Sequence, residues 1–527
     1  MAVKQGKKDD VTDVAFEDAM EIAGYGKFSM FIIFLTGLTL TTSTLGSVDV
    51  SFLLPAAECD LQLSSTDKGL LGSSFFIGII ASSHLSGFLA DTLGRKYVLV
   101  RGLSLNVLLY ILGTFAPNFW SFFIIKVISG ALTCPNVYRY NPTARRVRPD
   151  KEKSTSLADK HLTQHYRSPL LRLNWLADSQ GTWSLDLWIV TFKPWRLFFL
   201  LCAVPSLLCS ILFCLVPESP KFLLTRGNRE DTLKVLQRVH SINTGRVLDS
   251  YPVKSVIMDA NEVPPPPLAE GKGVLPVLKH ICDQTLPLFR PPFLKDLMLC
   301  VILMVDICLC ANTVFLWLPE ITNRISVYKE SHAADSTLCE MIRRDQSIVY
   351  GVTNTTSAPV ECVSTINTAV FLPNVLIALV RPVVMMTASI FVPLFDRRIV
   401  LGSLLVFGSS IAFLLTVVSN APIAITIFGA LTMVAVLSHN VLCSIVIEIF
   451  PTYISAMAVS INNIFGRLGA VLGSQLFSLL IDTECPLLFH LLSGTLLSCS
   501  VVPFFFKLQN KIPTPNERSR NTSLSIP

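Results

Sequence analysis

The chain has 527 residues, of which 51% are hydrophobic and only 15% are charged, and its net charge is +6. Soluble globular proteins carry about 25% charged residues, so this composition argues against one; it also excludes a disordered chain and a small disulfide-bonded scaffold. The small net charge gives no reason to expect nucleic-acid binding. Composition therefore predicts an all-α integral membrane protein with several spans.

The spans are visible as long apolar stretches. A membrane-spanning helix needs about 20 mainly apolar residues, because its backbone polar groups must be satisfied within the helix. Eleven such stretches occur, at 28–48, 69–90, 98–117, 119–134, 197–216, 297–319, 363–395, 399–418, 422–447, 456–481 and 486–506. They form two blocks, 28–216 and 296–506, separated by the polar segment 217–295, in which Arg229–Val239 is predicted to be a short amphipathic helix. Two similar helical halves with a site between them are typical of transporters.

Orientation follows from the basic residues. Residues 1–27 are polar, which predicts a cytoplasmic tail and not a cleaved signal peptide. Basic residues also concentrate between the second and third spans, in 217–295 and in the tail 507–527, so these segments are predicted to be cytoplasmic.

The loop 320–362 has more acidic than basic residues and is predicted to face the lumen or exterior. It contains Asn354-Thr355-Thr356, an acceptor sequence for N-glycosylation at Asn354. Cys339 and Cys362 bracket this loop and are candidates for a disulfide, with free thiols as the alternative. The sequence contains no metal-ligand spacing, phosphate loop or nucleophile elbow, so we expect no metal, no cofactor and no enzyme activity.

One motif directly after the second span carries a family resemblance. The run Gly87-Phe88-Leu89-Ala90-Asp91-Thr92-Leu93-Gly94-Arg95-Lys96 resembles the loop signature of the major facilitator superfamily. The resemblance implies a gating role for Gly87, Asp91, Gly94, Arg95 and Lys96. Physically, the glycines permit a tight turn, and Asp91 can cap the positive end of a helix. The alternative is an ordinary basic cytoplasmic loop.

Further motifs narrow the resemblance. The runs Pro217-Glu218-Ser219-Pro220, Lys193-Pro194-Trp195-Arg196 and Gly466-Arg467 are similar to those of the synaptic vesicle glycoprotein 2 and organic-ion-transporter-like branch. This resemblance implies the major facilitator fold, with two six-helix bundles and transport of a small solute. Twelve helices are implied, whereas eleven spans can be read.

The missing span is expected within 135–182, which contains thirteen charged residues, nine of them basic. Each Arg or Lys at the centre of a membrane helix costs about 2.5–3.5 kcal/mol, so this segment is not predicted to span. Three explanations remain open: an error in the gene model, a genuine isoform, or an interfacial or re-entrant helix over Asn174–Phe192.

Other family positions are altered. Asp396-Arg397-Arg398 stands where a second copy of the loop signature is expected, but it lacks the glycine. The motif that begins at Glu448 usually ends in Arg, and here that position is Ser455. The branch commonly has acidic residues in the outer part of the first span, where this chain keeps only Asp49. These changes weaken the case for ion coupling.

Polar groups in mid-membrane are costly and usually face a cavity or a partner. Asp306, about ten residues into its span, is therefore the first candidate for binding an ion or a cationic solute. The alternative is a structural ion pair with Lys126, Arg381 or Arg467.

Three more residues are candidates for substrate binding. Trp317 and Glu320 resemble a cavity-lining tryptophan and acid of this branch, with an interfacial belt position as the alternative for Trp317. Asp49 is either a site residue or an outer-rim residue. The glycines around Gly466 are expected to serve tight helix packing.

Two functions follow. The first is a multi-pass transporter that carries a small organic ion or sugar-like molecule by alternating access, in the bilayer of the plasma membrane or of a vesicle, with or without a coupling ion. The second is a vesicle membrane protein that no longer transports and has a regulatory or binding role. The oligomeric state is not predicted.

Overall fold

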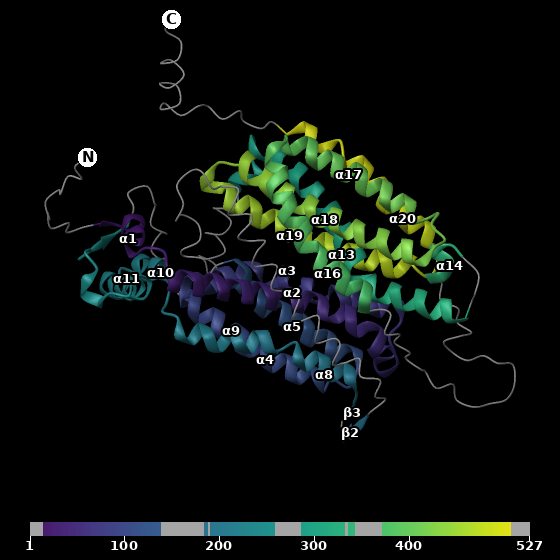
Figure 1. Cartoon of the computed structure of the whole chain (residues 1–527), viewed down its shortest axis with the longest axis horizontal. Coiled ribbons are helices and arrows are strands. Elements are labelled where there is room, and N and C mark those ends of the chain that lie inside the picture. The colour runs from purple at the N-terminus through teal and green to yellow at the C-terminus, as the bar shows by residue number, and fades with distance from the viewer. Residues whose placement is uncertain are drawn as a thin grey trace, which may run out of the picture.

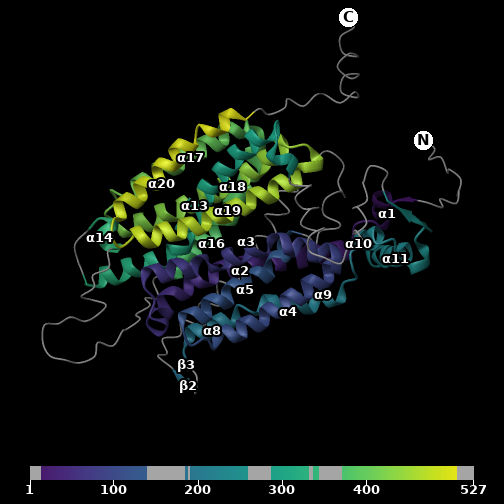
Figure 2. The ribbon, with the colours of Figure 1, turned by 180° about the vertical axis from the view of Figure 1, so that it is seen from behind.

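Two helical bundles lie side by side, one from each half of the chain (Figure 1). The computed structural model describes residues 14–138, 184–187, 190–258, 286–331, 336–342 and 371–506. We call the end that carries α14 (Leu338–Ile342) the outer end, following the orientation predicted from the basic residues. Figure 2 shows the same two bundles from behind, with the amino-terminal segment at the opposite, cytoplasmic end.

In the described part of the chain, each of the eleven predicted spans is mainly helical. The amino-terminal bundle contains α2 (Lys27–Leu61), α3 (Ser65–Leu93), α4 (Arg95–Thr114), α5 (Phe119–Tyr138), and α8 (Pro194–Leu201) with α9 (Val204–Leu215), which together form one crossing. The carboxy-terminal bundle contains α13 (Phe293–Ser331), α16 (Phe371–Phe391), α17 (Arg397–Leu414), α18 (Ala421–Ile449), α19 (Thr452–Leu480) and α20 (Cys485–Cys499). Short 3-10 turns are η3 (Leu286–Phe289), η5 (Val392–Leu394) and η6 (Val502–Phe505).

Length and hydropathy agree with a membrane protein. Among the described residues, eight helical segments are long and apolar enough to cross a membrane. The helices α3 and α19 have 29 residues each but are rich in serine and glycine, and they pack against each other between the bundles. Small residues at a helix interface let two backbones approach closely, which suits this position.

Two helices are longer than their apolar stretches. α2 has 35 residues and continues past 28–48, and α13 has 39 residues and continues past 297–319. The segment 320–362, predicted to be a loop, therefore begins as helix through Ser331. Both extensions carry charged residues whose partners, described below, lie in neighbouring helices.

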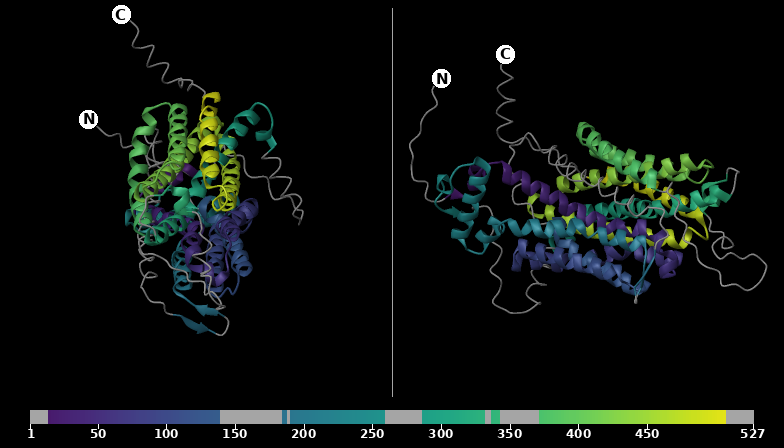
Figure 3. Two further views of the ribbon diagram at one scale, coloured as in Figure 1. Left: turned by 90° about the vertical axis from the view of Figure 1, so that its right-hand side faces the viewer. Right: turned by 60° about the horizontal axis from the view of Figure 1, so that its bottom comes forward.

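A small module at the end opposite α14, which the basic residues predict to be cytoplasmic, joins the amino-terminal tail to the central segment. α1 (Phe16–Ala23) packs on α11 (Arg229–Thr244), beside α10 (Pro220–Thr225) and η2 (Leu248–Ser250). β1 (Val14–Ala15) pairs in parallel with β4 (Val256–Ile257). The predicted helix Arg229–Val239 is confirmed and extends to Thr244. The module lies beyond the ends of the bundles in the right-hand view of Figure 3.

Buried polar contacts hold this module together. The Tyr251 hydroxyl donates to the Ala19 carbonyl at 2.6 Å. Burial raises the pKa of Tyr251 above its ordinary value, so the phenol stays protonated and remains a donor. The Asn243 side chain accepts from the Phe28 amide at 2.9 Å and donates to the Gly24 carbonyl at 2.6 Å, where α2 begins.

The charged segment expected to interrupt the fold is only partly visible. Residues 135–138 complete α5, and 139–183 lie outside the described residues. After them, β2 (Leu185–Leu187) pairs antiparallel with β3 (Val190–Phe192). The proposed re-entrant helix over Asn174–Phe192 is therefore wrong for these residues. Alternating and β-branched side chains favour a strand pair there.

Candidate functional site between the bundles

The bundles are joined at the outer end by a buried lysine. Lys68, in the first turn of α3, donates from Nζ to Glu58 Oε2 of α2 at 2.8 Å and to Glu320 Oε1 of α13 at 2.6 Å. The Lys68 side chain has 0% exposure and the Glu320 side chain 5%. The contact with Glu320 therefore links the two halves of the chain through a desolvated ion pair.

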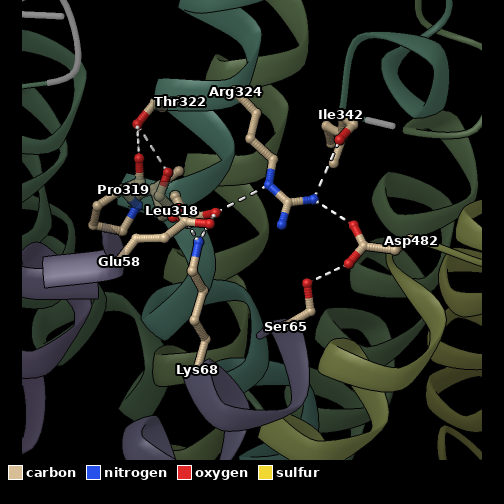
Figure 4. A network of polar contacts seen from close by, with 10 residues as sticks. Glu58, Ser65, Lys68, Leu318, Pro319, Thr322, Arg324, Ile342 and Asp482 are labelled. Atoms are coloured by element: carbon tan, nitrogen blue, oxygen red, sulfur yellow. Dashed lines mark hydrogen bonds and ion pairs between the residues drawn. The ribbon is translucent and has the colours of Figure 1, made fainter. Parts of the chain in front are cut away.

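Arg324 extends this contact into a network (Figure 4). Its Nε lies 3.0 Å from Glu320 Oε1, and its Nη1 lies 2.7 Å from Asp482 Oδ1, just after α19. Ser65, at the start of α3, donates to the other oxygen of Asp482. We call Glu58, Ser65, Lys68, Glu320, Arg324 and Asp482 the outer network.

The outer network carries one net negative charge, and each of its charged groups is paired. Two cations face three carboxylates, and each charged group has an oppositely charged partner within 3.0 Å. Breaking a buried ion pair by removing one partner costs about 3–5 kcal/mol, because the other charge is left desolvated. The network therefore favours the arrangement in which the outer ends of the bundles touch.

Neutral contacts between α3 and α19 support the same closure. Ser474 Oγ donates to the Gly69 carbonyl at 3.0 Å, and Gln475 Nε2 donates to Ser73 Oγ at 3.1 Å. A Cβ at Gly69 would lie 2.6 Å from Ser478 Cβ, so a larger residue does not fit there. These contacts lie in the outer part of both helices.

A disulfide stands next to the network, but it is not the expected one. Cys339 of α14 is bonded to Cys485, the first residue of α20. The predicted pairing of Cys339 with Cys362 is therefore wrong. Sequence spacing favoured two cysteines of one loop, whereas folding brings the start of α20 beside Cys339. Cys59, near the outer end of α2, is also disulfide-bonded.

The disulfide positions a further contact of the network. Ile342, three residues after Cys339, offers its carbonyl to Arg324 Nη1 at 3.3 Å. Cys362 and the glycosylation candidate Asn354 lie outside the described residues.

Asp49 lies within the amino-terminal bundle, with 0% exposure. Its two oxygens lie 2.7 and 2.8 Å from Lys126 Nζ of α5, and Tyr110 donates to Oδ2 at 2.8 Å. Lys126 also donates to the Gly46 carbonyl at 2.9 Å. The Asp49 carboxylate is thus fully occupied by this bundle in the present conformation.

The other candidate residues lie in the carboxy-terminal bundle. Asp306 is 8% exposed and lies beside Thr495 and Cys499 of α20, which places it inside that bundle. Trp317 is 1% exposed and stacks on Phe477 of α19, with 4.8 Å between ring centroids. Trp317 is therefore not an interfacial belt residue.

The two cytoplasmic motifs of the amino-terminal half contact each other. Glu218 accepts from the backbone amides of Lys96 at 3.0 Å and Ser219 at 2.9 Å. Gly94 has φ +103°, and a Cβ there would meet Glu218 Oε2 at 2.8 Å. This explains why the turn uses glycine and why a carboxylate stands between Pro217 and Pro220.

Other motif residues have structural contacts. Gly87 and Asp91 lie in the last turns of α3, and their side-chain positions are outside the described part. A Cβ at Gly466 would lie 2.8 Å from Met304 Cγ and 3.0 Å from Cys308 Sγ of α13, so the helices approach closely at this residue. Arg467, the next residue, is half-buried.

A corresponding contact occurs in the second half. Arg397, at the degenerate second loop signature, forms an ion pair with Glu448 at 2.8 Å. This pair joins two motifs that the sequence places 51 residues apart. Both partners are about one-third exposed, so the pair contributes little stability by itself.

The Lys-Pro-Trp-Arg motif closes the outer end of the amino-terminal bundle. Asp60 accepts from Lys193 Nζ at 2.5 Å and from Trp195 Nε1 at 2.7 Å. Arg196 donates to the carbonyls of Thr114 and Ala116. The motif therefore ties α8 to α2 and α4.

Sequence reasoning singled out Glu320 but missed its partners Lys68 and Arg324, and Asp482, which pairs with Arg324. The available signal was their position, since each charge lies within a few turns of the outer end of a predicted span. Hydropathy alone cannot pair such residues, because most of the partners lie on different helices and Lys68 lies in the other half of the chain. Among the described residues no group of three or more His, Cys, Asp or Glu side chains is placed to hold a metal ion.

Comparison with known families agrees with this architecture. Residues 29–139 match the model of the Major Facilitator Superfamily, and residues 184–514, more than half of the chain, match that of the sugar (and other) transporters. The chain belongs to the sugar (and other) transporter family. Neither match includes residues 140–183, the charged segment at which the family pattern is interrupted.

Individual relatives are similar over part of their length. Human synaptic vesicle glycoprotein 2B is 31% identical over 232 residues, which cover 43% of this chain and 34% of that protein. Rat synaptic vesicle glycoprotein 2A is 29% identical over 242 residues, 43% of this chain and 31% of that protein. The chain thus spans about a third of the length of the curated relatives that it matches.

Solved structures show the same fold. The partially occluded inward-open form of the xylose transporter XylE from E. coli has a TM-score of 0.60 at 14% identity, covering 90% of this chain and 99% of that one. Its inward-open form also has a TM-score of 0.60, at 15% identity. The predicted two-bundle major facilitator fold is therefore confirmed, as is a multi-pass membrane protein.

Proposed function

We propose that this family member moves a small organic solute across the membrane by alternating access, without converting it chemically. The observation that carries the proposal is the Lys68–Glu320 ion pair, which joins the two bundles at the outer end. An immobile structural protein has no need of a desolvated ion pair at that seam, since apolar packing of similar volume is at least as stable.

The outer network then acts as the outer gate. For the outer side to open, Lys68 must leave Glu320, and Asp482 must leave Ser65. Each step separates groups that are paired in the closed state and exposes them to water. Opening therefore requires compensating contacts elsewhere in the protein. On the cytoplasmic side the loop Gly87–Lys96, anchored by Glu218, is the segment proposed to supply them.

A coupling ion is part of the proposal. The Asp49–Lys126 pair is buried in the amino-terminal bundle, with both side chains at 0% exposure. Protonation of Asp49 would leave Lys126 without its counter-charge, so a proton bound there changes the energy of the bundle. Solute offered with and without an imposed pH gradient tests this coupling.

The experiment uses the full chain in proteoliposomes and radiolabelled monosaccharides, organic cations and organic anions. Lys68→Met removes the bridging cation, and Lys329→Met, an exposed lysine on α13, is the matched control. Lys68→Met should lower uptake of the transported solute at least about tenfold, because the outer gate no longer closes, while Lys329→Met should not change it.

Two outcomes contradict the proposal. Uptake by Lys68→Met equal to wild type would remove the outer network from the mechanism. No uptake of any class by well-folded wild-type protein would contradict transport itself.

A second candidate function is a binding or regulatory membrane protein without transport. The similarity to synaptic vesicle glycoproteins 2A and 2B favours it. Thermal stabilisation of the purified chain by a solute that is never taken up would support this function over transport.

A further inference from the structure

Arg381 is a charged residue in the interior of a membrane helix. It lies ten residues after the start of α16, which has 21 residues, so its Cα is about 15 Å along the helix axis. That depth is close to the middle of a hydrocarbon layer of about 30 Å. Arginine remains charged in proteins, so the site must tolerate a full positive charge.

This charge lacks the partners that the other interior cations have. Lys68 and Lys126 form ion pairs with carboxylates, and Arg196 donates hydrogen bonds to two backbone carbonyls. The Arg381 guanidinium lies over the ring of Phe315 on α13, 5.6 Å from its centroid. Within the part of the chain that the structure describes, Arg381 takes part in no hydrogen bond or ion pair. A cation–π contact alone does not satisfy five N–H donors.

Arg381 does not face the lipid. At 3.6 residues per turn, the exposed residues Leu379 and Val383 lie on the opposite side of α16. Asn374 and Met385, on the same side as Arg381, are buried, and Met385 Sδ accepts from Asn440 of α18 at 3.6 Å. The arginine side of α16 therefore faces α13 and α18, inside the protein.

The described side-chain contact of Arg381 is the ring of Phe315, and both residues are half-buried. Asn312, one turn before Phe315 on α13, donates to the Cys308 carbonyl of its own helix at 3.0 Å. Asp306 lies beside Thr495 and Cys499 of α20, and its Oδ2 is buried without a hydrogen-bond partner among the described residues. Arg381 and Asp306 form no ion pair with each other in the described part of the chain.

We propose that Arg381 binds the carboxylate of the transported solute, which makes the substrate class an organic anion with an apolar or aromatic body. A carboxylate accepts two parallel N–H bonds from a guanidinium, and this is the geometry that arginine favours. The Phe315 ring supplies an apolar surface for the rest of the molecule. The inference rests on the proposed transport function and deepens it. Asp49 offers no free acid for a cationic solute, since Lys126 and Tyr110 already bind its carboxylate.

The test compares two probes of nearly the same size and shape, one with a carboxylate and one with a neutral amide in its place. Phenylacetate and phenylacetamide are titrated against the purified full chain in detergent, with binding followed by isothermal calorimetry. Wild type should bind phenylacetate at least about tenfold more tightly than the amide, because a guanidinium forms stronger hydrogen bonds with a carboxylate than with a neutral amide. Arg381→Gln should abolish this preference, and Arg381→Lys should keep part of it. Arg398→Gln, a cytoplasmic arginine, is the matched control and should behave as wild type.

Equal binding of the two probes by wild type would overturn the proposal. So would a preference that survives in Arg381→Gln. Removing an interior charge is not expected to prevent folding, and the melting temperature of each variant checks this.

Uptake of phenylacetate into proteoliposomes separates this inference from the proposed function. Preferential binding without uptake would leave the anion site standing and contradict transport. Uptake of a neutral sugar with no preference for the carboxylate would support transport and overturn the anion site.

Discussion

At the scale of single residues, the interior charges determine what the bundles can do. The Asp49–Lys126 pair lies within one bundle, whereas the Lys68–Glu320 pair crosses between bundles. Rocking of the bundles as rigid bodies separates the partners of the second pair but not those of the first. The first pair therefore responds to protonation of Asp49, and the second responds to opening of the outer gate.

Lys126→Met tests the structural pair. The substitution leaves Asp49 buried without a counter-ion, so the free energy of unfolding should fall by about 3–5 kcal/mol. The double variant Asp49→Asn with Lys126→Met should recover most of this loss, because neither charge remains. Denaturation of the protein in detergent measures both. A double variant that is less stable than Lys126→Met alone would contradict the pairing.

At the scale of helices, glycine sets how closely neighbours approach. A Cβ at Gly469 of α19 would lie 2.3 Å from the Val305 carbonyl oxygen of α13, and one at Gly78 of α3 would lie 1.9 Å from the Val127 carbonyl oxygen of α5. These backbone contacts leave no room for a side chain. Packing at such sites replaces the hydrophobic effect, which does not drive helix association within lipid.

Gly469→Leu should therefore separate α13 from α19 and lower the yield of folded protein, with a loss of stability of at least about 1–3 kcal/mol. Gly494→Leu on α20 is the matched control, because no atom lies within 4 Å of a Cβ there. Size-exclusion profiles and melting temperatures in detergent compare the two variants. Equal profiles would show that the interface is not tight.

At the scale of the whole molecule, three kinds of bond hold the outer end, and two of them join the bundles. The outer network joins α2, α3, α13 and the end of α19, serine hydrogen bonds join α3 to α19, and the Cys339–Cys485 disulfide joins α14 to α20. The disulfide lies within the second half, so it can stay intact while the bundles move.

Peptide mapping under non-reducing conditions should recover Cys339 joined to Cys485. Cys339→Ser and Cys485→Ser should each lower stability by about 2–5 kcal/mol, and the double variant by no more than either, since a single bond is lost. Cys214→Ser, at an exposed free thiol, should have no effect. A peptide that joins Cys339 to Cys362 would contradict the structure.

The sequence by itself determined the membrane class, the position of all eleven spans and the motifs that resemble the major facilitator superfamily. It could do so because hydropathy and short motifs are local properties, read within about 20 residues. The ends of α2 and α13 were predicted too early for the same reason. Charged residues end an apolar stretch, but they do not end a helix when partners neutralise them.

Only the tertiary structure decided which charges meet. Glu320 was singled out from its helix, but its partner Lys68 lies 252 residues away in the other bundle. Cys339 forms a disulfide with Cys485 and not with Cys362 of its own loop. Lys126 forms an ion pair with Asp49 and not with Asp306. Pairing between residues that are far apart in the sequence depends on how the helices pack. That packing cannot be read from the composition of the chain.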